Sequence, residues 1–241
     1  MERGWRFREF IAGFRYGAPI MLGYAPVSFA FAVAAVGNGI PWPIVLLISL
    51  SNFTSAGQQA GAGLLAAGAP FPEIGVTVLI INIRYMLMSL SLSQKMLKIP
   101  LAKRLLLAAG VTDEIFFLGM QKEELSGWFF TGLASGPYLG WSIGTLGGAL
   151  AGTMLPASLS SALGIALYAM FIAIVIPEMR KEHPALWVVL CAVGLSCLFQ
   201  YVPGLNLVPS GWALIISAVA ASLLGALLFP VKPDEKGRIV A

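Results

Sequence analysis

The chain has 241 residues, of which 58% are hydrophobic and only 11% are charged, and its formal net charge is +4. A soluble domain carries about 25% charged residues, so this composition excludes a soluble enzyme or a nucleic-acid-binding domain. Apolar runs long enough to cross a bilayer recur along the chain, which predicts a polytopic membrane helix bundle rather than a β-barrel.

The apolar runs predict an all-α membrane protein with about eight hydrophobic segments, some of them broken or re-entrant. In chain order the segments are 16–36, 43–67, 72–94, 103–121, 128–155, 160–177, 185–202 and 207–229. We expect a cytoplasmic N-terminal segment at 1–15, a single transmembrane domain at 16–230 and a cytoplasmic tail at 231–241.

The distribution of basic residues predicts that both termini are cytoplasmic. If all eight segments cross the membrane, ten lysines and arginines face the cytoplasm and four face outward, namely Lys95, Lys98, Lys103 and Arg104. Basic residues favour the cytoplasmic side, so these four form an exception. The exception disappears if the second and fourth segments are re-entrant. Eight crossing segments remain the preferred interpretation, with re-entry as the alternative.

The second segment is unusually polar between Ser49 and Gln59. Serine, threonine and asparagine compete for backbone hydrogen bonds, and glycine weakens a helix. The pattern predicts an unwound stretch between two half-helices, whose exposed N–H groups would attract a carboxylate. Packing of small polar residues between helices is the alternative.

Arg84 lies in the middle of the third segment, two residues after Asn82. Its guanidinium cannot be neutralised and costs roughly 2.5–3.5 kcal/mol at the centre of a membrane helix. It therefore needs a partner, a water-filled cavity or a ligand. Carboxylate capture or proton gating is the functional interpretation, and a structural ion pair between helices is the alternative.

Asp113 and Glu114 in the fourth segment are the expected partners of Arg84. In an antiparallel hairpin of the third and fourth segments, Arg84 and Asp113 would both lie about 15 Å from the connecting loop. Adjacent helical residues point about 100° apart, so at most one acid can face the arginine. A desolvated carboxylate there could carry protons. In the alternative, the segment is interfacial and both acids face water.

The fifth segment carries a glycine at every fourth position. The glycines are Gly136, Gly140, Gly144, Gly148 and Gly152. This spacing forms a smooth stripe on which another helix backbone can pack closely, although a sliding surface is an alternative. In the first segment, Pro19 and Pro26 predict a kink.

The remaining reactive side chains indicate no enzyme, cofactor or metal site. Cys191 and Cys197 are six positions apart in one segment, so no disulfide is expected, and the single histidine, His183, lies in a charged loop. No metal-ligand spacing or nucleotide-binding motif is present.

Several short motifs together resemble the AzlC family, the large subunit of bacterial branched-chain amino acid exporters. They are Gly17-x-Pro19, Gly23-Tyr24-x-Pro26, Ser55-Ala56-Gly57-Gln58, Asn82-x-Arg84, Thr112-Asp113-Glu114 and a tryptophan–glycine run from Trp141. The resemblance covers about residues 8–230. It implies an inner-membrane permease for hydrophobic amino acids and a small AzlD-like membrane subunit as partner. Its motif residues of interest here are Pro26, Gln58, Asn82, Arg84, Asp113 and Glu114.

The chain departs from the family pattern at two positions. Tyr85 stands where members often have a histidine, so a proton role for that histidine is absent here. Gln59 stands where an aromatic residue often follows the glutamine, which leaves the preferred substrate open.

Residues and resemblance together favour an ion-gradient-coupled exporter of branched-chain or other hydrophobic amino acids. The expected substrate-binding residues are Pro26, Ser51, Asn52, Ser55, Gly57, Gln58, Asn82 and Arg84. Asp113 and Glu114 are expected to couple transport to protons, and the five glycines to pack helices. The alternative is a non-transporting membrane scaffold or assembly subunit.

Overall fold

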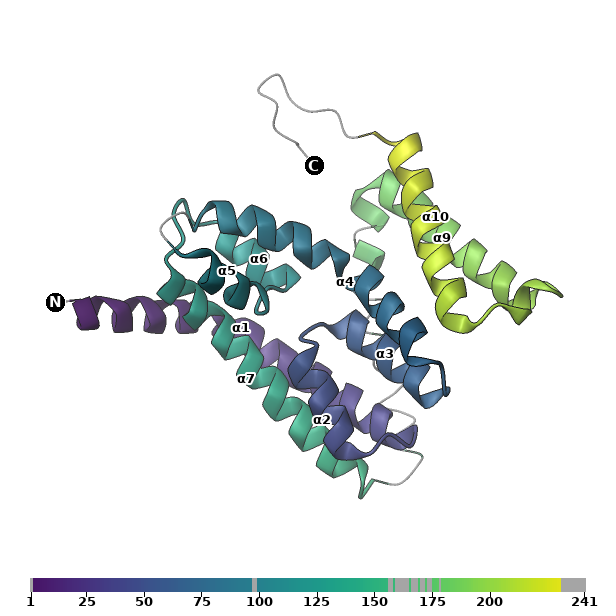
Figure 1. Ribbon diagram of the computed structural model, residues 1–241, viewed down its shortest axis with the longest axis horizontal. Helices are drawn as coiled ribbons and strands as arrows, with labels where there is room; N and C mark the ends of the chain where they lie inside the picture. The colour runs from purple at the N-terminus through teal and green to yellow at the C-terminus, as the bar shows by residue number, and fades with distance from the viewer. Residues whose placement is uncertain are drawn as a thin grey trace. The chain divides into compact units, whose positions relative to one another are not determined.

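Figure 1 shows the computed structural model of the chain, which describes residues 2–96, 99–155 and 182–230 and some positions between 158 and 181. The helices are α1 (Glu2–Gly37), α2 (Trp42–Ser51), α3 (Ser55–Ala66), α4 (Phe71–Gln94), α5 (Leu101–Ala108), α6 (Asp113–Met120), α7 (Gly127–Gly152), α9 (His183–Tyr201), the 3-10 helix η1 (Leu205–Leu207) and α10 (Ser210–Leu228). All regular structure in the described residues is helical, which confirms the all-α prediction. Most of the predicted segment 160–177 and the whole tail 231–241 lie outside the described residues.

The chain forms two compact units. The first comprises Met1–Gly68 and Val78–Leu167, and the second comprises Ala69–Thr77 and Tyr168–Ala241. Within the described residues, four helical stretches are long and apolar enough to cross a membrane: Gly4–Gly37, Phe71–Gln94, His183–Tyr201 and Ser210–Leu228. Eight crossing segments are therefore not found among these residues.

The first unit is built on α1 and α7, which run parallel to each other. Gly132 of α7 lies against Phe10 of α1, and Gly148 lies against Phe29, so residue numbers rise in the same direction along both helices. A Cβ added at Gly140 would come 2.5 Å from the carbonyl oxygen of Met21, because the two backbones touch there. The other glycines of the stripe, Gly136, Gly144 and Gly152, also lie against α1. Without side chains on this face of α7, the backbones can approach closely.

Helices α2 and α3 form a hairpin that enters the unit at the C-terminal end of α7. Near its base, Val45 and Ala62 share a buried cluster with Ala149. Near its tip, the hydroxyl of Tyr138 donates to the carbonyl oxygen of Leu50 at 2.9 Å. The hairpin thus runs inward along α7 and returns to the end at which it started.

A buried hydroxyl pair anchors this hairpin to α7. Ser49 and Thr145 are fully buried, and their hydroxyl oxygens lie 2.6 Å apart. Replacing Ser49 with alanine leaves the Thr145 hydroxyl without its partner, which should lower the free energy of unfolding by about 1–3 kcal/mol. The double variant Ser49→Ala/Thr145→Val should recover most of this loss, because neither polar group remains. Thermal melting of the three purified variants in detergent measures the coupling, and additive losses would contradict it.

Helices α5 and α6 form a second hairpin, which enters from the N-terminal end of α7. At its base, the ammonium of Lys95 donates to the carbonyl oxygens of Met120 and Lys122, both at 2.6 Å. At its tip, Gly110 approaches Ala134, almost two turns into α7. Each hairpin returns to its own end of the unit, so the structure favours re-entry over crossing for the second and fourth predicted segments.

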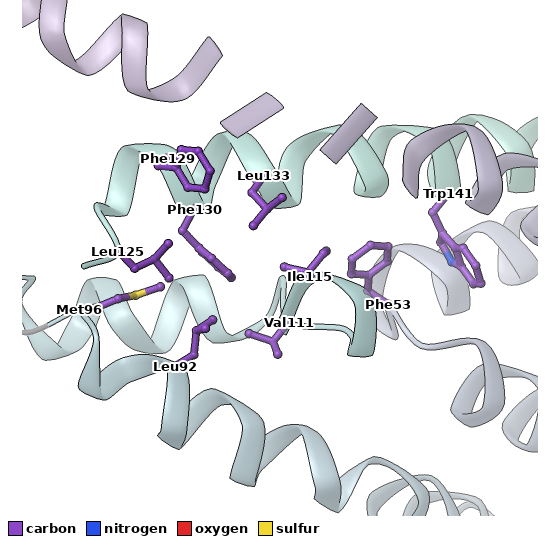
Figure 2. Close-up of a cluster of buried hydrophobic side chains, with 10 residues drawn as sticks. All are labelled: Phe53, Leu92, Met96, Val111, Ile115, Leu125, Phe129, Phe130, Leu133 and Trp141. Carbon is purple, nitrogen blue, oxygen red and sulfur yellow. The ribbon is translucent and has the colours of Figure 1, made fainter. Parts of the chain in front are cut away.

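The tips of the two hairpins meet in a buried cluster beside α7. Phe53 from the first tip and Val111 and Ile115 from the second belong to one hydrophobic cluster, which also contains Trp141 and Leu133 of α7 (Figure 2). The interior of the first unit is therefore made by two interrupted helices that approach from opposite ends.

The second unit contains α9, α10 and the first residues of α4. The N–H of Gly211, near the start of α10, donates to the carboxylate of Glu73 at 2.8 Å, and Glu73 is buried. A carboxylate is favourable at a helix N-terminus because the N–H groups there are unpaired and partly positive. Both cysteines of α9 are free thiols.

Candidate polar site at the hairpin tips

The first hairpin is interrupted at Asn52, Phe53 and Thr54, where the sequence predicts an unwound stretch. Helix α2 ends at Ser51, and α3 starts again at Ser55. The hydroxyl of Thr54 caps α3 by accepting a hydrogen bond from the N–H of Gly57 at 3.1 Å. The break is thus formed locally by residues that prefer helix ends to helix interiors.

Asn82 of α4 holds this break in place. Its side-chain amide donates to the carbonyl oxygen of the Asn52 side chain at 3.0 Å, and its own carbonyl oxygen accepts from the Thr54 hydroxyl at 2.9 Å. The side-chain nitrogen and oxygen of Asn82 therefore bind Asn52 and Thr54, the two residues that flank Phe53. These hydrogen bonds bring together two of the predicted binding residues, Asn52 and Asn82.

The second hairpin is interrupted between Ala108 and Asp113, within the predicted segment 103–121, where no break was predicted. The hydroxyl of Thr112 caps α6 by accepting from the N–H of Ile115 at 3.5 Å. Tyr24 of α1 holds this tip, since its hydroxyl hydrogen-bonds to Thr112 Oγ1 at 2.9 Å and to the carboxylate of Glu114. Tyr24 and Thr112 were not predicted as site residues.

Arg84 pairs with Asp113, as the sequence analysis expects for one of the two acids. Arg84 Nη2 lies 2.9 Å from Asp113 Oδ2, and Tyr85 joins the pair by accepting from Arg84 at 3.0 Å and donating to Asp113 at 3.2 Å. The guanidinium also lies 4.9 Å from the centre of the Tyr85 ring. The two charged side chains are 49% and 41% exposed in the isolated chain, so neither is enclosed by the protein alone.

An open hollow of about 600 Å³ lies between α1 and α6 and gives access to the acids. Asp113 and Glu114 line it together with Pro19 of α1 and Phe117 of α6. The hollow combines an apolar wall with two carboxylates and with Arg15 and Tyr16 of α1.

Gln58, in the first turn of α3, has a buried polar group without a partner. The indole N–H of Trp141 lies 3.3 Å from the side-chain carbonyl oxygen of Gln58. Because an indole can only donate, the carbonyl must face Trp141, and the amide nitrogen points elsewhere. This nitrogen is buried and has no hydrogen-bond partner among the residues that the structure describes, and the Gln58 side chain as a whole is only 1% exposed. Buried donors are nearly always satisfied, so this one needs an acceptor.

An aromatic cluster connects the Gln58 region to the acids. The ring of Tyr24 packs edge-on against Trp141 at a centroid distance of 5.2 Å and against Phe53 at 5.9 Å. Since Trp141 contacts Gln58 and Tyr24 contacts Glu114, these two rings connect the unpaired donor to the carboxylates. The cluster supplies an apolar surface between two polar regions.

Among the described residues, three predicted binding residues, Ser51, Pro26 and Ser55, form no hydrogen bond with this network, whereas Gly57 does. The hydroxyl of Ser51 donates to the carbonyl oxygens of Leu47 and Ile48 in its own helix, at 2.8 and 3.2 Å. Pro26 is exposed within α1, which continues through it without interruption. Ser55 is the first residue of α3, and Gly57 supplies the N–H that Thr54 caps.

Comparisons with known proteins place the chain among membrane proteins. The family model described as "AzlC protein" matches residues 19–155. An "Uncharacterized membrane protein" of Archaeoglobus fulgidus is 32% identical over 222 residues, which cover 91% of this chain and 93% of that protein. "Inner membrane protein YgaZ" of Escherichia coli is 29% identical over 184 residues, covering 72% of this chain and 75% of that protein. No solved structure matches the chain.

Proposed function

Because the chain belongs to the AzlC family of membrane proteins, we propose that it is a secondary transporter that exports branched-chain or other hydrophobic amino acids. It would act in the inner (plasma) membrane of a bacterium, with both termini in the cytoplasm and a small AzlD-like membrane subunit as its partner. The unpaired, buried amide of Gln58 beside a half-helix N-terminus is the observation that carries this proposal.

The substrate carboxylate would bind at the start of α3. The first turn of α3 contains no acidic residue, so the partial positive charge of its N–H groups is not neutralised there. The amide nitrogen of Gln58 adds donors on a buried side chain in the same turn. A carboxylate is the acceptor that satisfies both, and discontinuous helices bind substrate carboxylates in this way in other transporters. The apolar side chain would pack on the aromatic cluster.

Coupling to protons would use the acids at the start of α6. Glu114 is held by Tyr24, whereas Asp113 is held by Arg84 and Tyr85. Ionisable groups within membrane segments commonly form ion or proton pathways. The hollow between α1 and α6 would connect these carboxylates to the aqueous phase.

Replacing Gln58 with glutamate tests the carboxylate site. The change removes two donors and adds a negative charge, so export should fall on the order of 10- to 100-fold, the value of a hydrogen bond to a charged group. The measurement is the initial rate of labelled leucine efflux from proteoliposomes that contain the chain and its small subunit. Gln59→Glu, a matched change at the next position, should export much closer to the parent rate.

A second variant at Gln58 distinguishes loss of the carboxylate site from misfolding caused by a buried charge. Gln58→Leu removes the donors without adding charge, and it should raise the leucine concentration needed for half-maximal efflux. If both Gln58 variants transport like the parent, the carboxylate does not bind here. If the parent itself moves no hydrophobic amino acid, the non-transporting scaffold is the better interpretation.

A further inference from the structure

The two hairpins and the helices that precede them are related by a constant shift along the chain. A shift of 58 residues takes the cap of α3, Thr54, to the cap of α6, Thr112. The same shift takes Phe53 to Val111, the apolar residue at each tip. The order of elements also repeats, since α1 is followed by the broken pair α2 and α3, and α4 by the broken pair α5 and α6.

The shift also relates the two residues that hold the tips. It takes Tyr24 of α1 to Asn82 of α4. Tyr24 hydrogen-bonds to Thr112, and Asn82 hydrogen-bonds to Thr54, so each helix holds the cap of the other hairpin. Reciprocal contacts of this kind are what a two-fold axis generates, because residue i then contacts j' while i' contacts j.

The two halves are inverted with respect to each other. The first hairpin enters at the C-terminal end of α7, where Ala62 shares a cluster with Ala149. The second enters at the N-terminal end of α7, where Lys95 binds the carbonyl oxygens of Met120 and Lys122. Phe53 and Val111 lie in the cluster between them (Figure 2). A two-fold axis that passes between these residues, in the plane of the membrane, would exchange the hairpins. Many secondary transporters are built from such inverted repeats, and they bind substrate where the repeats meet.

We infer that α1–α3 and α4–α6 are inverted repeats, and that Tyr24 and Asn82 are equivalent positioning residues that each latch one hairpin tip. The role of the latches in transport rests on the proposed function, whereas the repeat itself does not. Releasing the Tyr24 latch frees the second hairpin and opens the tip cluster towards the N-terminal end of α7. Releasing the Asn82 latch frees the first hairpin and opens the cluster towards the opposite end.

The repeats have diverged where their chemistry differs. Position 55 is serine and position 56 alanine, whereas the equivalent positions 113 and 114 are aspartate and glutamate. The first turn of α3 therefore contains no acidic residue and can bind a carboxylate, whereas the first turn of α6 carries two carboxylates of its own. In the proposed transporter, this difference makes α1–α3 the repeat that binds substrate and α4–α6 the repeat that couples transport to protons.

Sided accessibility of the tip cluster tests the latches. The reporter is Val111→Cys in a background where Cys191 and Cys197 are serine, because Val111 is 4% exposed and belongs to the cluster. A charged, membrane-impermeant thiol reagent is applied to right-side-out and to inside-out vesicles. Tyr24→Phe should raise the labelling rate about tenfold from one side and Asn82→Leu about tenfold from the other, since each loses the hydrogen bonds that close one tip.

Matched controls separate sidedness from general loosening. Tyr16→Phe makes the same change on α1 but removes only the bond to Gln121, and it should leave labelling unchanged from both sides. Thr112→Val and Thr54→Val each remove one hydrogen bond of a latch from its other end, and each should raise labelling from the same side as the matching latch variant. A latch variant that raises labelling equally from both sides, or two that raise it from the same side, would overturn the inference.

The accessibility test is independent of the substrate. If the two latch variants raise labelling from opposite sides but the parent exports no leucine, the inverted repeat is supported and the proposed function is rejected. Leucine export by a chain whose latch variants open on one side only would reject the repeat and retain the function.

Discussion

Export should be lost, by on the order of 100-fold, when either Arg84 or Asp113 is replaced by a neutral residue. Arg84→Met leaves the Asp113 carboxylate without its cation, and Asp113→Asn leaves a guanidinium that cannot be neutralised. Each unpaired charge costs roughly 2.5–3.5 kcal/mol at the centre of a membrane helix, so both single variants should also melt at lower temperature. Labelled leucine efflux and thermal melting in detergent measure the two effects.

The double variant Arg84→Met/Asp113→Asn separates a functional ion pair from a structural one. With both charges removed, no unpaired ion remains, and stability should return close to that of the parent. Efflux should stay low, because the proposed coupling carboxylate is gone. A double variant that recovers stability and transport together would assign the pair to helix packing alone. Arg8→Met, which removes an exposed arginine of α1 outside the hollow, should change stability by no more than about 0.5 kcal/mol.

The break in the first hairpin could be predicted because its signal is local. Asn52 and Thr54 interrupt an otherwise apolar run, and their side chains favour helix ends over helix interiors. The pairing of Arg84 with an acid was predictable for a similar reason, since a permanent cation in hydrocarbon requires a partner. Local chemistry and the cost of desolvation are sufficient for these features.

The break in the second hairpin lacks such a signal. The run before Thr112 is apolar. Its one glycine near the break, Gly110, is no signal of a break, because single glycines are common in unbroken membrane helices. The sequence Thr112-Asp113-Glu114 is nevertheless typical of a helix start, with a hydroxyl cap followed by acids in the first turn. Recognising it as a cap would have placed both acids at a helix N-terminus rather than inside a continuous helix.

The roles of Tyr24 and Trp141 could not be predicted, because their partners are far away in the chain. Tyr24 contacts Glu114, and Trp141 contacts Gln58, over separations of 90 and 83 residues. Aromatic side chains in apolar helices are common, and neither periodicity nor spacing distinguishes one that holds a hairpin tip. Only the fold brings these partners together.

Re-entry of the two hairpins would also account for the basic residues that do not fit eight crossing segments. Lys95 binds carbonyl oxygens at residues 120 and 122, just before the start of α7, so the loop after α4 lies at the same end of the unit as that start. Because α1 and α7 are parallel, the N-terminus of α1 lies there too. Lys95 would then share one side with the basic residues of the N-terminus, as the positive-inside rule favours.

Replacing Gly57 with alanine should disrupt the first hairpin tip although it adds only one methyl group. A Cβ at this position would lie 2.5 Å from the Thr54 hydroxyl and 2.6 Å from the Asn82 carbonyl oxygen. Both atoms belong to the latch, so relieving the overlap must break or lengthen its hydrogen bonds. Overpacking costs about 1–3 kcal/mol and each lost hydrogen bond about 1 kcal/mol, which together predict a loss of roughly 2–4 kcal/mol in unfolding free energy.

Gly63→Ala is the matched control, because it makes the same change in the same helix, where no atom lies within 4 Å of the added Cβ. Alanine is a better helix former than glycine by about 1 kcal/mol, so this variant should melt at or above the temperature of the parent and should transport normally. Gly57→Ala should instead melt lower and lose most leucine efflux, since the N–H groups at the start of α3 move when the cap is displaced. Equal melting and equal efflux for the two variants would mean that the contact between Asn82 and the α2–α3 break does not close the tip, and the carboxylate site proposed beside it would lose its structural support.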